Sequence, residues 1–333
     1  MAEIGSPTLL NHLRLSSATA NLRRQAEIAR SELVTGRIAD LPKALGGRLG
    51  GAQLLRKALD DLAVERAAID RAGLRANVAQ STLGAVSAGA SGLNASLLAA
   101  LGRGDQQTIA NSAVEARSQL GAAFAQLNVR VEGRSLFAGD AGDRPALASA
   151  DILLSDIATL FAAAADAAQF EADLDVYFND PAGGFRTVIY QGGAGDAASL
   201  EIAPGETVIA TARADEQGVK DMIRGLSAIA VAATAGPSSK RDQSLAFAGA
   251  TLLKGDSGVL DLRTRIGLEE ARAEDARMRI ESEEVALTAA YNAMTSRDPF
   301  EAASRLQALE SQIEASFVLT SRLSRLSLTN FLR

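Results

Sequence analysis

The chain of 333 residues contains no cysteine, no tryptophan and only one histidine, His12. The absence of cysteine excludes disulfides, thiol nucleophiles and cysteine-ligated metals. A single histidine excludes a multi-histidine metal centre, and it excludes a conventional serine–histidine pair elsewhere in the chain. The shortage of reactive side chains therefore argues against most enzyme chemistries, and we expect no catalytic site, no cofactor and no metal.

Basic charge and long apolar runs are also scarce. Lys and Arg number 34 against 40 Asp and Glu, and no long basic run is present, which argues against a nucleic-acid partner. No stretch approaches the ~18 apolar residues of a membrane helix, since Asp166 interrupts the nearest one, 160–168. The N-terminus lacks the basic and apolar regions of a cleaved secretory signal. We expect a soluble protein that does not bind membranes and that leaves the cell, if it does, without a cleaved signal.

Apolar residues, in contrast, recur every seven residues over two long stretches, which is typical of coiled-coil-like helical rods. Aromatic residues are only 4% of the chain, which further favours helices over sheets. The expected seam residues are Leu55, Leu62, Ile69, Ala76, Leu83, Ala90 and Leu97 in the first stretch and Leu252, Val259, Ile266, Ala273, Ile280, Leu287 and Met294 in the second. Because the stretches are equally long, we expect the two helices to lie side by side. Gly255 and Gly258 weaken the expected first turn of the second helix.

A third helix is expected over 105–131, with Asp105 as its cap. The middle of the chain differs, because a helical run at 150–175 is followed by strand-like segments at 185–190, 199–202 and 207–212 and by a helix at 216–233. Residues 203–206 (Ala-Pro-Gly-Glu) predict a hairpin between the last two strands. The predicted fold is mainly α: a long helical rod formed by the N- and C-terminal halves, with a small inserted α+β domain at 141–237.

Each terminus carries an apolar stripe on a predicted helix outside the rod, at 8–35 and at 300–331. Such helices are marginal alone in water, so we expect them to pair with each other, with neighbouring copies, or with both. The expected domains are 1–45 with 296–333 as terminal helices, 46–140 with 238–295 as the rod, and 141–237 as the insertion. A chain with apolar helices at both ends is suited to assembly.

Two short motifs are similar to catalytic or nucleotide-binding sequences but lack the structural context that those functions require. Gly255-Asp256-Ser257-Gly258 is like the nucleophile turn of serine proteases, yet it lies in a helical stretch and has no histidine near it in the sequence. Gly192-Gly193-Ala194-Gly195 does not complete a dinucleotide fingerprint, and a hairpin loop is the better interpretation. Neither motif changes the prediction of a non-enzymatic protein.

The C-terminal residues Leu326-Ser327-Leu328-Thr329-Asn330-Phe331-Leu332 resemble the ending of proteins of the flagellin superfamily, in particular the hook-associated proteins of the hook–filament junction. Gly133-Arg134-Ser135-Leu136-Phe137-Ala138-Gly139 is similar to the step that follows the family's third helix. Thr35-Gly36-Arg37-Ile38 is similar to the step after its first helix, and Tyr190-x-Gly192 to a motif of its β region. The chain departs from the family at 39–53, which is glycine-rich and contains Pro42 where a Ser/Asp/Pro-rich turn is common.

The resemblance implies a secreted structural subunit that joins hook to filament by self-assembly. The implied partners are further copies of the chain, a neighbouring hook-associated protein, flagellin, and an export chaperone at the C-terminal helix. Export without a cleaved signal through the flagellar type III channel is implied too, with terminal helices that stay disordered until assembly. The residues expected to bury the assembly contacts are Leu15, Leu22, Leu33, Leu306, Ile313, Phe317, Leu323, Leu326 and Phe331.

Three alternatives remain open at the level of the sequence. A filament flagellin would share the terminal helices and the rod. A cytoplasmic coiled-coil scaffold or signalling protein would use the same heptads without being exported. A serine hydrolase acting through Ser257 would be labelled by an active-site-directed phosphonate, and we expect no such labelling.

Overall fold

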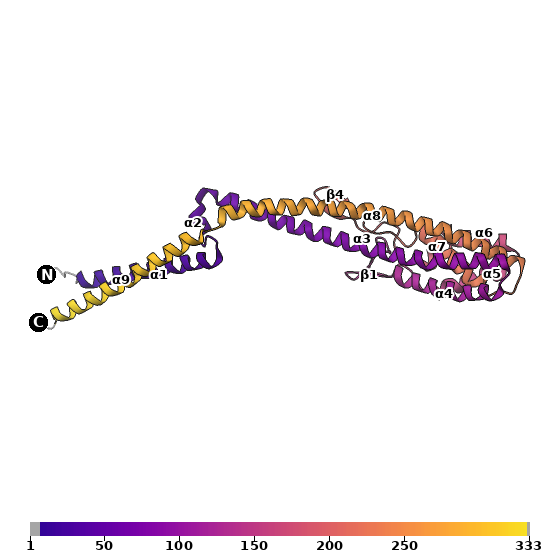
Figure 1. Cartoon of the computed structure of the whole chain (residues 1–333), viewed down its shortest axis with the longest axis horizontal. Helices are drawn as coiled ribbons and strands as arrows, with labels where there is room; N and C mark the ends of the chain where they lie inside the picture. Colours follow the sequence, from indigo (N-terminus) through magenta and orange to yellow (C-terminus); the bar gives the residue numbers. More distant parts are fainter. Residues whose placement is uncertain (1–6, 332–333) are drawn as a thin grey trace. The chain divides into compact units, whose positions relative to one another are not determined.

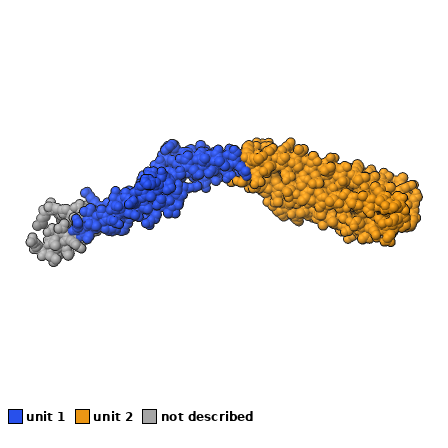
Figure 2. Space-filling model, in the orientation of Figure 1, with its two compact units in different colours: residues 1–62, 281–333 blue, residues 63–280 orange. Residues whose placement is uncertain are grey.

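The computed structural model describes residues 7–331 of the chain, with side chains from Leu13 to Arg322. It divides into two compact units, residues 1–62 with 281–333 (unit 1) and residues 63–280 (unit 2), coloured separately in Figure 2. Long helices dominate both, and the described residues include two small antiparallel hairpins in unit 2. The predicted mainly α fold with a small α+β portion is thus confirmed.

Unit 1 contains the two terminal helices, α1 (Pro7–Thr35) and α9 (Pro299–Phe331), which lie side by side (Figure 1). Their antiparallel pairing follows from two contacts: Thr19 Oγ1 lies 2.7 Å from Ser316 Oγ, and Arg30 lies 3.7 Å from Glu310. Proline opens both helices, where its missing N–H costs nothing. Unit 1 also holds α2 (Leu41–Leu45), a 3₁₀ turn (Gly46–Arg48), the start of α3 (Leu49–Arg103) and the end of α8 (Ser239–Thr295).

In unit 2, α3 and α8 run antiparallel along each other. Gln80 Nε2 donates to the backbone oxygen of Arg263 at 2.6 Å, and the Ser87 hydroxyl donates to Asp256. Gly249 of α8 lies against Asn94 of α3, so the contact continues along the helices. The expected side-by-side arrangement of the two heptad helices is confirmed here.

Helix α4 (Gln106–Leu127) begins as expected, because the Asp105 carboxylate accepts a hydrogen bond from Thr108 N at 3.1 Å. It ends four residues before the expected Val131. The chain then forms a tight hairpin of β1 (Arg130–Val131) and β2 (Arg134–Ser135), turning through Gly133 at a φ of 78°. Phe137 follows the hairpin and is fully buried. The Gly-Arg-x-Leu-Phe step is therefore a hairpin anchored by an aromatic ring.

The expected helix at 150–175 is two helices, α5 (Ala150–Ala163) and α6 (Ala167–Asn179), because Ala164 is extended and Asp166 caps a new helix. The predicted strand at 185–190 is wrong. Residues Phe185–Ile189 form a single π-helical turn, whose buried members Phe185 and Ile189 are four residues apart rather than alternating. The predicted hairpin is confirmed, with β3 (Leu200–Ala203) and β4 (Glu206–Val208) joined through Gly205.

Helix α7 (Gln217–Ala232) lies at the centre of unit 2 and is buried along almost its whole length, against α4, α5 and α8. Its approach to α8 depends on glycine. A Cβ at Gly255 would lie 2.5 Å from Met222 N, and one at Gly258 would lie 2.6 Å from the Cα of Gly218. The doubt about the first turn of α8 was misplaced, because the helix already begins at Ser239 and its glycines serve packing.

One hydrophobic cluster joins the helices of unit 2. It includes Leu83 and Leu97 of α3, Leu120 of α4 and Ile266 of α8, together with Phe170, Phe185 and Ile223 from the segment expected as an insertion. Residues 141–237 therefore share their core with the long helices. The two units are a coarser division than the three domains expected from the sequence.

By length and composition alone, Leu41–Arg103 contains a window apolar enough to cross a membrane, with a mean hydropathy of 1.3, although the sequence led us to expect none. Core helices pass the same test. Leu83 and Leu97, two large seam residues of this segment, are fully buried within unit 2. Alanine-rich composition and core packing account for the apolar character of this helix.

Candidate assembly interface

The seam between α1 and α9 repeats every seven residues. Apart from Glu32, the side chains of α1 and α9 that are shielded from solvent follow alternating steps of four and three residues, as in a coiled coil. They are Leu15, Thr19, Leu22, Ala26, Ala29 and Leu33 on α1, and Ala302, Leu306, Leu309, Ile313, Ser316 and Thr320 on α9. Many are small or polar, so the pair buries little apolar area for its length.

Five of the expected assembly residues, Leu15, Leu22, Leu33, Leu306 and Ile313, lie in this seam and are half-buried. The stripes thus have a partner within the same chain, as one of the expected options foresaw. Phe317 lies beside the seam, 48% exposed, with the Arg23 guanidinium 5.1 Å from its ring centre. The side chains of Leu323, Leu326, Phe331 and His12 lie outside the described residues.

The expected seam residues of α3 and α8 are divided between the two units, and their burial differs. Leu62 belongs to unit 1 and is buried, whereas Leu55 and Leu287 of the same unit are half-buried. Five other expected seam residues lie in unit 2 and are buried there: Ile69, Leu83, Leu252, Ile266 and Ile280.

A second apolar surface of the terminal helices was missed by sequence reasoning. The large apolar side chains Leu13, Ile28, Val34, Phe300, Val318 and Leu319 are exposed. On α9, exposed residues away from the seam include Phe300, Ser304, Gln307, Ser311, Ala315 and Val318, hereafter the outer stripe, and the exposed carboxylate of Glu314 lies beside them.

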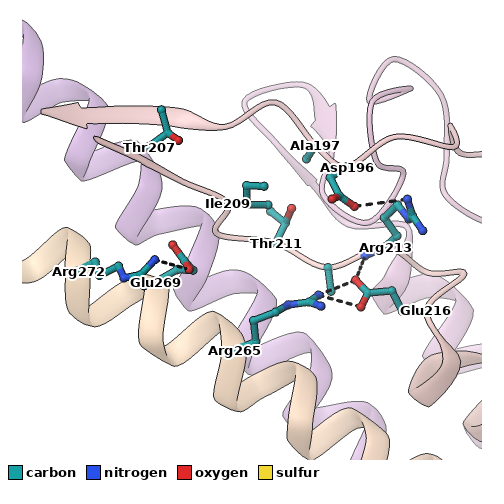
Figure 3. A pocket seen from close by; sticks show the side chains of 11 residues that line it. Asp196, Ala197, Thr207, Ile209, Thr211, Arg213, Glu216, Arg265, Glu269 and Arg272 are labelled. Atoms are coloured by element: carbon teal, nitrogen blue, oxygen red, sulfur yellow. Dashed lines mark hydrogen bonds and ion pairs between the residues drawn. The ribbon is translucent and has the colours of Figure 1, made fainter. Parts of the chain in front are cut away.

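Unit 2 contains a polar pocket of about 440 Å³ between the extended segment after β4 and helix α8 (Figure 3). Thr207, Ile209 and Thr211 line one wall, and Arg265 and Arg272 line the other. Its arginines are paired: Arg265 lies 2.7 Å from Glu216, Arg272 lies 3.0 Å from Glu269, and Arg213 contacts Asp215 and Asp196. The internal neutralisation leaves the pocket without a marked preference for anions or cations.

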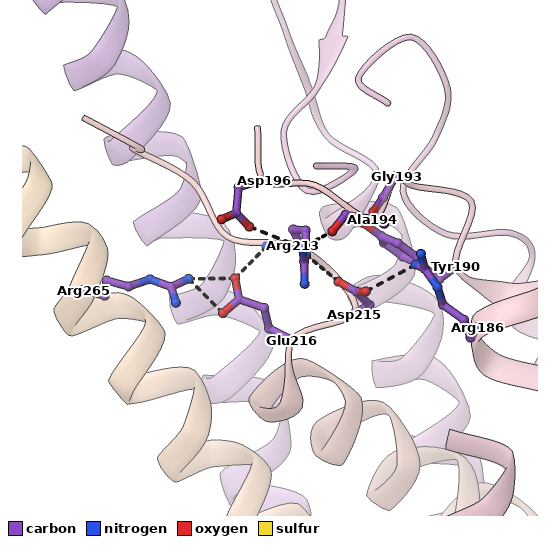
Figure 4. A network of polar contacts seen from close by, with 9 residues as sticks. All are labelled: Arg186, Tyr190, Gly193, Ala194, Asp196, Arg213, Asp215, Glu216 and Arg265. Carbon is purple, nitrogen blue, oxygen red and sulfur yellow. Dashed lines mark hydrogen bonds and ion pairs between the residues drawn. The ribbon is translucent and has the colours of Figure 1, made fainter. Parts of the chain in front are cut away.

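Arg213 anchors the loop that contains the Gly-Gly-Ala-Gly motif (Figure 4). Its guanidinium donates to the backbone oxygen of Ala194, and Asp215 bridges it to Arg186. Tyr190 donates to the backbone oxygen of Gly193 at 3.0 Å, and burial raises the pKa of its hydroxyl. The glycine motif is therefore part of a packed loop, and it neither follows a strand of a parallel sheet nor opens a helix.

Ser257 lies exposed in the middle of α8, not on a turn. The neighbouring Asp256 accepts a hydrogen bond from Ser87 of α3. Among the residues that the structure describes, no group of three or more His, Asp or Glu side chains is placed to hold a metal ion. The protease-like tetrapeptide is helix-packing sequence.

The fold class is that of long antiparallel helices with a partly covered pair of terminal helices. Residues 257–332 match the bacterial flagellin C-terminal helical region. These residues carry the flagellin family's C-terminal region, and the predicted likeness to the flagellin superfamily is confirmed. No curated protein sequence matches the chain.

Two solved structures share the fold. A structure assigned as a flagellar hook-associated protein from Vibrio parahaemolyticus has a TM-score of 0.54 at 13% identity and covers 74% of this chain and 97% of its own. FlgL from Bacillus cereus has a TM-score of 0.53 at 15% identity and covers 72% of this chain and 98% of its own. These two likenesses show the fold, and the match of residues 257–332 adds the likeness to the flagellin C-terminal helical region.

Proposed function

We propose that the chain is the subunit that joins the flagellar hook to the filament, and that it assembles with further copies of itself through its terminal helices. The observation that carries this proposal is the pairing of α1 with α9, which leaves Phe300 and Val318 of the outer stripe exposed on the other side of α9. Large apolar side chains left exposed on a helix are candidates for protein–protein contacts. The hook-associated character of both similar structures supports the junction over other positions in the flagellum.

Two classes of residues have different roles in this proposal. Leu15, Leu22, Leu33, Leu306 and Ile313 hold the two terminal helices together within one subunit. The outer stripe, together with Phe317 and the sequence-predicted residues Leu323, Leu326 and Phe331, contacts neighbouring copies. Secretion by the flagellar export system, an export chaperone bound to the C-terminal helix, and contacts with flagellin and with a hook-side neighbour belong to the same proposal.

The test replaces an outer-stripe residue without touching the seam. Val318→Asp places a charge on the exposed face of α9, and Val114→Asp is the matched control, because Val114 is an exposed valine of α4 in unit 2. We expect cells with Val318→Asp to release flagellin into the medium and to stop swimming, whereas Val114→Asp cells swim. Leu323→Asp with Leu326→Asp should act like Val318→Asp while leaving unit 2 folded. Normal swimming of the α9 variants would refute the assignment.

A filament flagellin is the second candidate, because the matched family region is that of flagellins. Deleting the gene separates the two roles. Loss of a junction subunit leaves hooks while unpolymerised flagellin accumulates outside the cell, and loss of a filament flagellin removes that extracellular flagellin. Immunogold labelling of isolated flagella gives a short band at the hook tip in the first case and the whole filament in the second. A cytoplasmic scaffold would remain in the cell when flagellar export is blocked.

A further inference from the structure

A segment of unit 2 that contains the β3–β4 hairpin leaves the body of the unit and returns to it at one place. Where it leaves, Asp140 N donates a hydrogen bond to the backbone oxygen of Gly195 at 3.0 Å. Where it returns, Ala214 N donates to the oxygen of Phe137 at 2.9 Å. Phe137 is fully buried, so both ends of the segment are tied to a fixed point. We call the segment between these ties, residues 196–212, the strap.

Two ion pairs fasten the strap along helix α8. Just beyond its base, Nη2 of Arg265 lies 2.7 and 2.8 Å from the two carboxylate oxygens of Glu216 (Figure 3). Near its tip, Arg279 lies 3.8 Å from Glu206 of β4. The two arginines are separated by about four helical turns, or roughly 21 Å at a rise of 1.5 Å per residue. The strap therefore follows α8 with a charged contact at each end.

Between these two contacts the strap is loosely packed on the helix. The polar cavity of about 440 Å³ lies here, with Thr207 and Ile209 of the strap on one side and Arg272 on the other (Figure 3). Arg272 pairs with a glutamate of its own helix and so does not fasten the strap. The side chains of Arg265 and Arg279 are 53% and 51% exposed, and ion pairs exposed to this extent are weak. Releasing the strap should therefore cost much less free energy than unfolding unit 2.

Helix α4 covers only part of the long helices, and their seam stays buried beyond it. Gly89 of α3 lies against Gln119 of α4, which continues for only about two turns more. Ile69 lies more than five turns before Gly89, roughly, and thus beyond the end of α4. Ile69 is nevertheless 3% exposed, and Ile280 of α8 is 1% exposed. Because a fully buried side chain has neighbours on all sides, a third element must cover this stretch.

The strap supplies this cover. Its buried apolar side chains include Ile202 of β3 and Val208 of β4, which are 0% and 1% exposed, whereas Glu201 faces water. A two-stranded hairpin has no core of its own, so side chains buried to this extent rest on the helices beneath it. The ion pair of Arg279 places the tip of the strap beside Ile280. The strap thus takes the place of a third helix over this part of the α3–α8 seam.

We propose that the strap opens and closes as one unit about its tied base, and that its opening uncovers the apolar seam of α3 and α8 while unit 2 stays folded. The two ion pairs with α8 determine how often it opens. The inference concerns unit 2 of a single chain, so it depends neither on the state of the terminal helices nor on a position in the flagellum. It makes access to an apolar surface conditional on two exposed charge contacts.

Thiol labelling of the full-length chain tests the strap, because the chain has no cysteine of its own. Val208→Cys places a thiol beneath the strap, and Ser199→Cys places one at an exposed position of the strap. Val259→Cys places one in the main core of unit 2, where Val259 is 0% exposed. Each is combined with Arg265→Gln, which removes one fastening, or with Arg272→Gln, the matched control from the same cavity. Mass spectrometry follows the reaction with iodoacetamide under native conditions.

The Val208→Cys thiol should react more slowly than that of Ser199→Cys and about tenfold or more faster than that of Val259→Cys, because opening of the strap needs no unfolding of the core. Arg265→Gln should accelerate labelling of Val208→Cys about three- to tenfold, and Arg272→Gln less than about twofold. Sodium chloride at about 1 M should act like Arg265→Gln, since salt screens exposed ion pairs. Neither change should accelerate labelling of Val259→Cys.

Two results would overturn the proposal. A Val208→Cys thiol that reacts as slowly as that of Val259→Cys, with or without Arg265→Gln, would show that the strap opens only when unit 2 unfolds. One that reacts as fast as that of Ser199→Cys would show that the strap is not closed. Ile202→Cys, on the other strand, gives the same measurement if circular dichroism shows that Val208→Cys does not fold.

Discussion

The two units use the same heptad spacing and bury it to different extents. In unit 2, Leu83 of α3 and Ile266 of α8 are fully shielded, because α4 and α7 join the same hydrophobic cluster. In the α1–α9 pair of unit 1, Leu22 and Ile313 occupy equivalent spacing and remain half-buried, because each helix covers only one side of the other. The number of neighbouring helices, rather than the heptad itself, decides how much a seam residue stabilises the fold.

Truncating one leucine from each unit tests this difference most directly. Leu83→Ala should lower the free energy of unfolding of unit 2 by about 3 kcal/mol, since it leaves a cavity in a closed core. Leu22→Ala should cost about 1 kcal/mol or less, because its side chain is only partly shielded and the exposed site can relax around the truncation. Urea denaturation followed by circular dichroism measures the first effect, and amide exchange within α1 and α9 measures the second. Equal losses would show that burial does not distinguish the units.

Glycine at the α7–α8 contact is the second point of comparison, because the described α1–α9 seam contains none. Gly255→Ala should destabilise unit 2 by about 2 kcal/mol, since its Cβ would overlap the backbone of Met222. Gly92→Ala is the control: nothing lies within 4 Å of its Cβ, so the gain in helix propensity should stabilise by about 0.5–1 kcal/mol. Thermal unfolding of both variants shows whether each substitution raises or lowers the Tm. A neutral Gly255→Ala would contradict close packing at this crossing.

The smallest effect concerns charge in unit 2. Hydrogen bonds from Asn179 and from Arg224, at 2.9 Å in the latter case, lower the pKa of Asp175. A carboxyl whose pKa is depressed in the folded state stabilises above its unfolded pKa, about 3.9, and loses that contribution as the pH falls through the lower folded value. The difference in Tm between the parent chain and Asp175→Asn should therefore be present at pH 7 and shrink as the pH falls below about 4. A difference that persists in acid would point to lost packing instead.

Patterns carried by single helices were the most predictable part of this protein. The heptads placed α3 and α8 side by side, Asp105 identified the start of α4, and Pro204-Gly205 identified the β3–β4 hairpin. Mistakes arose where a short apolar segment had two possible periods. The sequence around Phe185 and Ile189 is compatible with an extended strand. Both residues are buried, however, and their spacing of four residues is that of a helical turn.

The candidate interface was also predictable only in part. Spacing alone was enough to find five seam residues, because a heptad identifies the apolar face of a helix. They are Leu15, Leu22, Leu33, Leu306 and Ile313. Which partner covers that face could not be found, because α1 and α9 are separated by most of the chain. The exposed Phe300 and Val318 became visible only once the seam was known to be occupied.

The sequence by itself determined the helical class, the spacing of the seams and the flagellin-like ends, because these depend on residues that are neighbours along one helix. Only the tertiary structure decided that α7 enters the core through Gly218, Gly255 and Gly258, and that Glu32 meets Arg297. Those contacts join residues far apart in the chain, and close approach and buried pairing are properties of the packed helices that no local pattern contains.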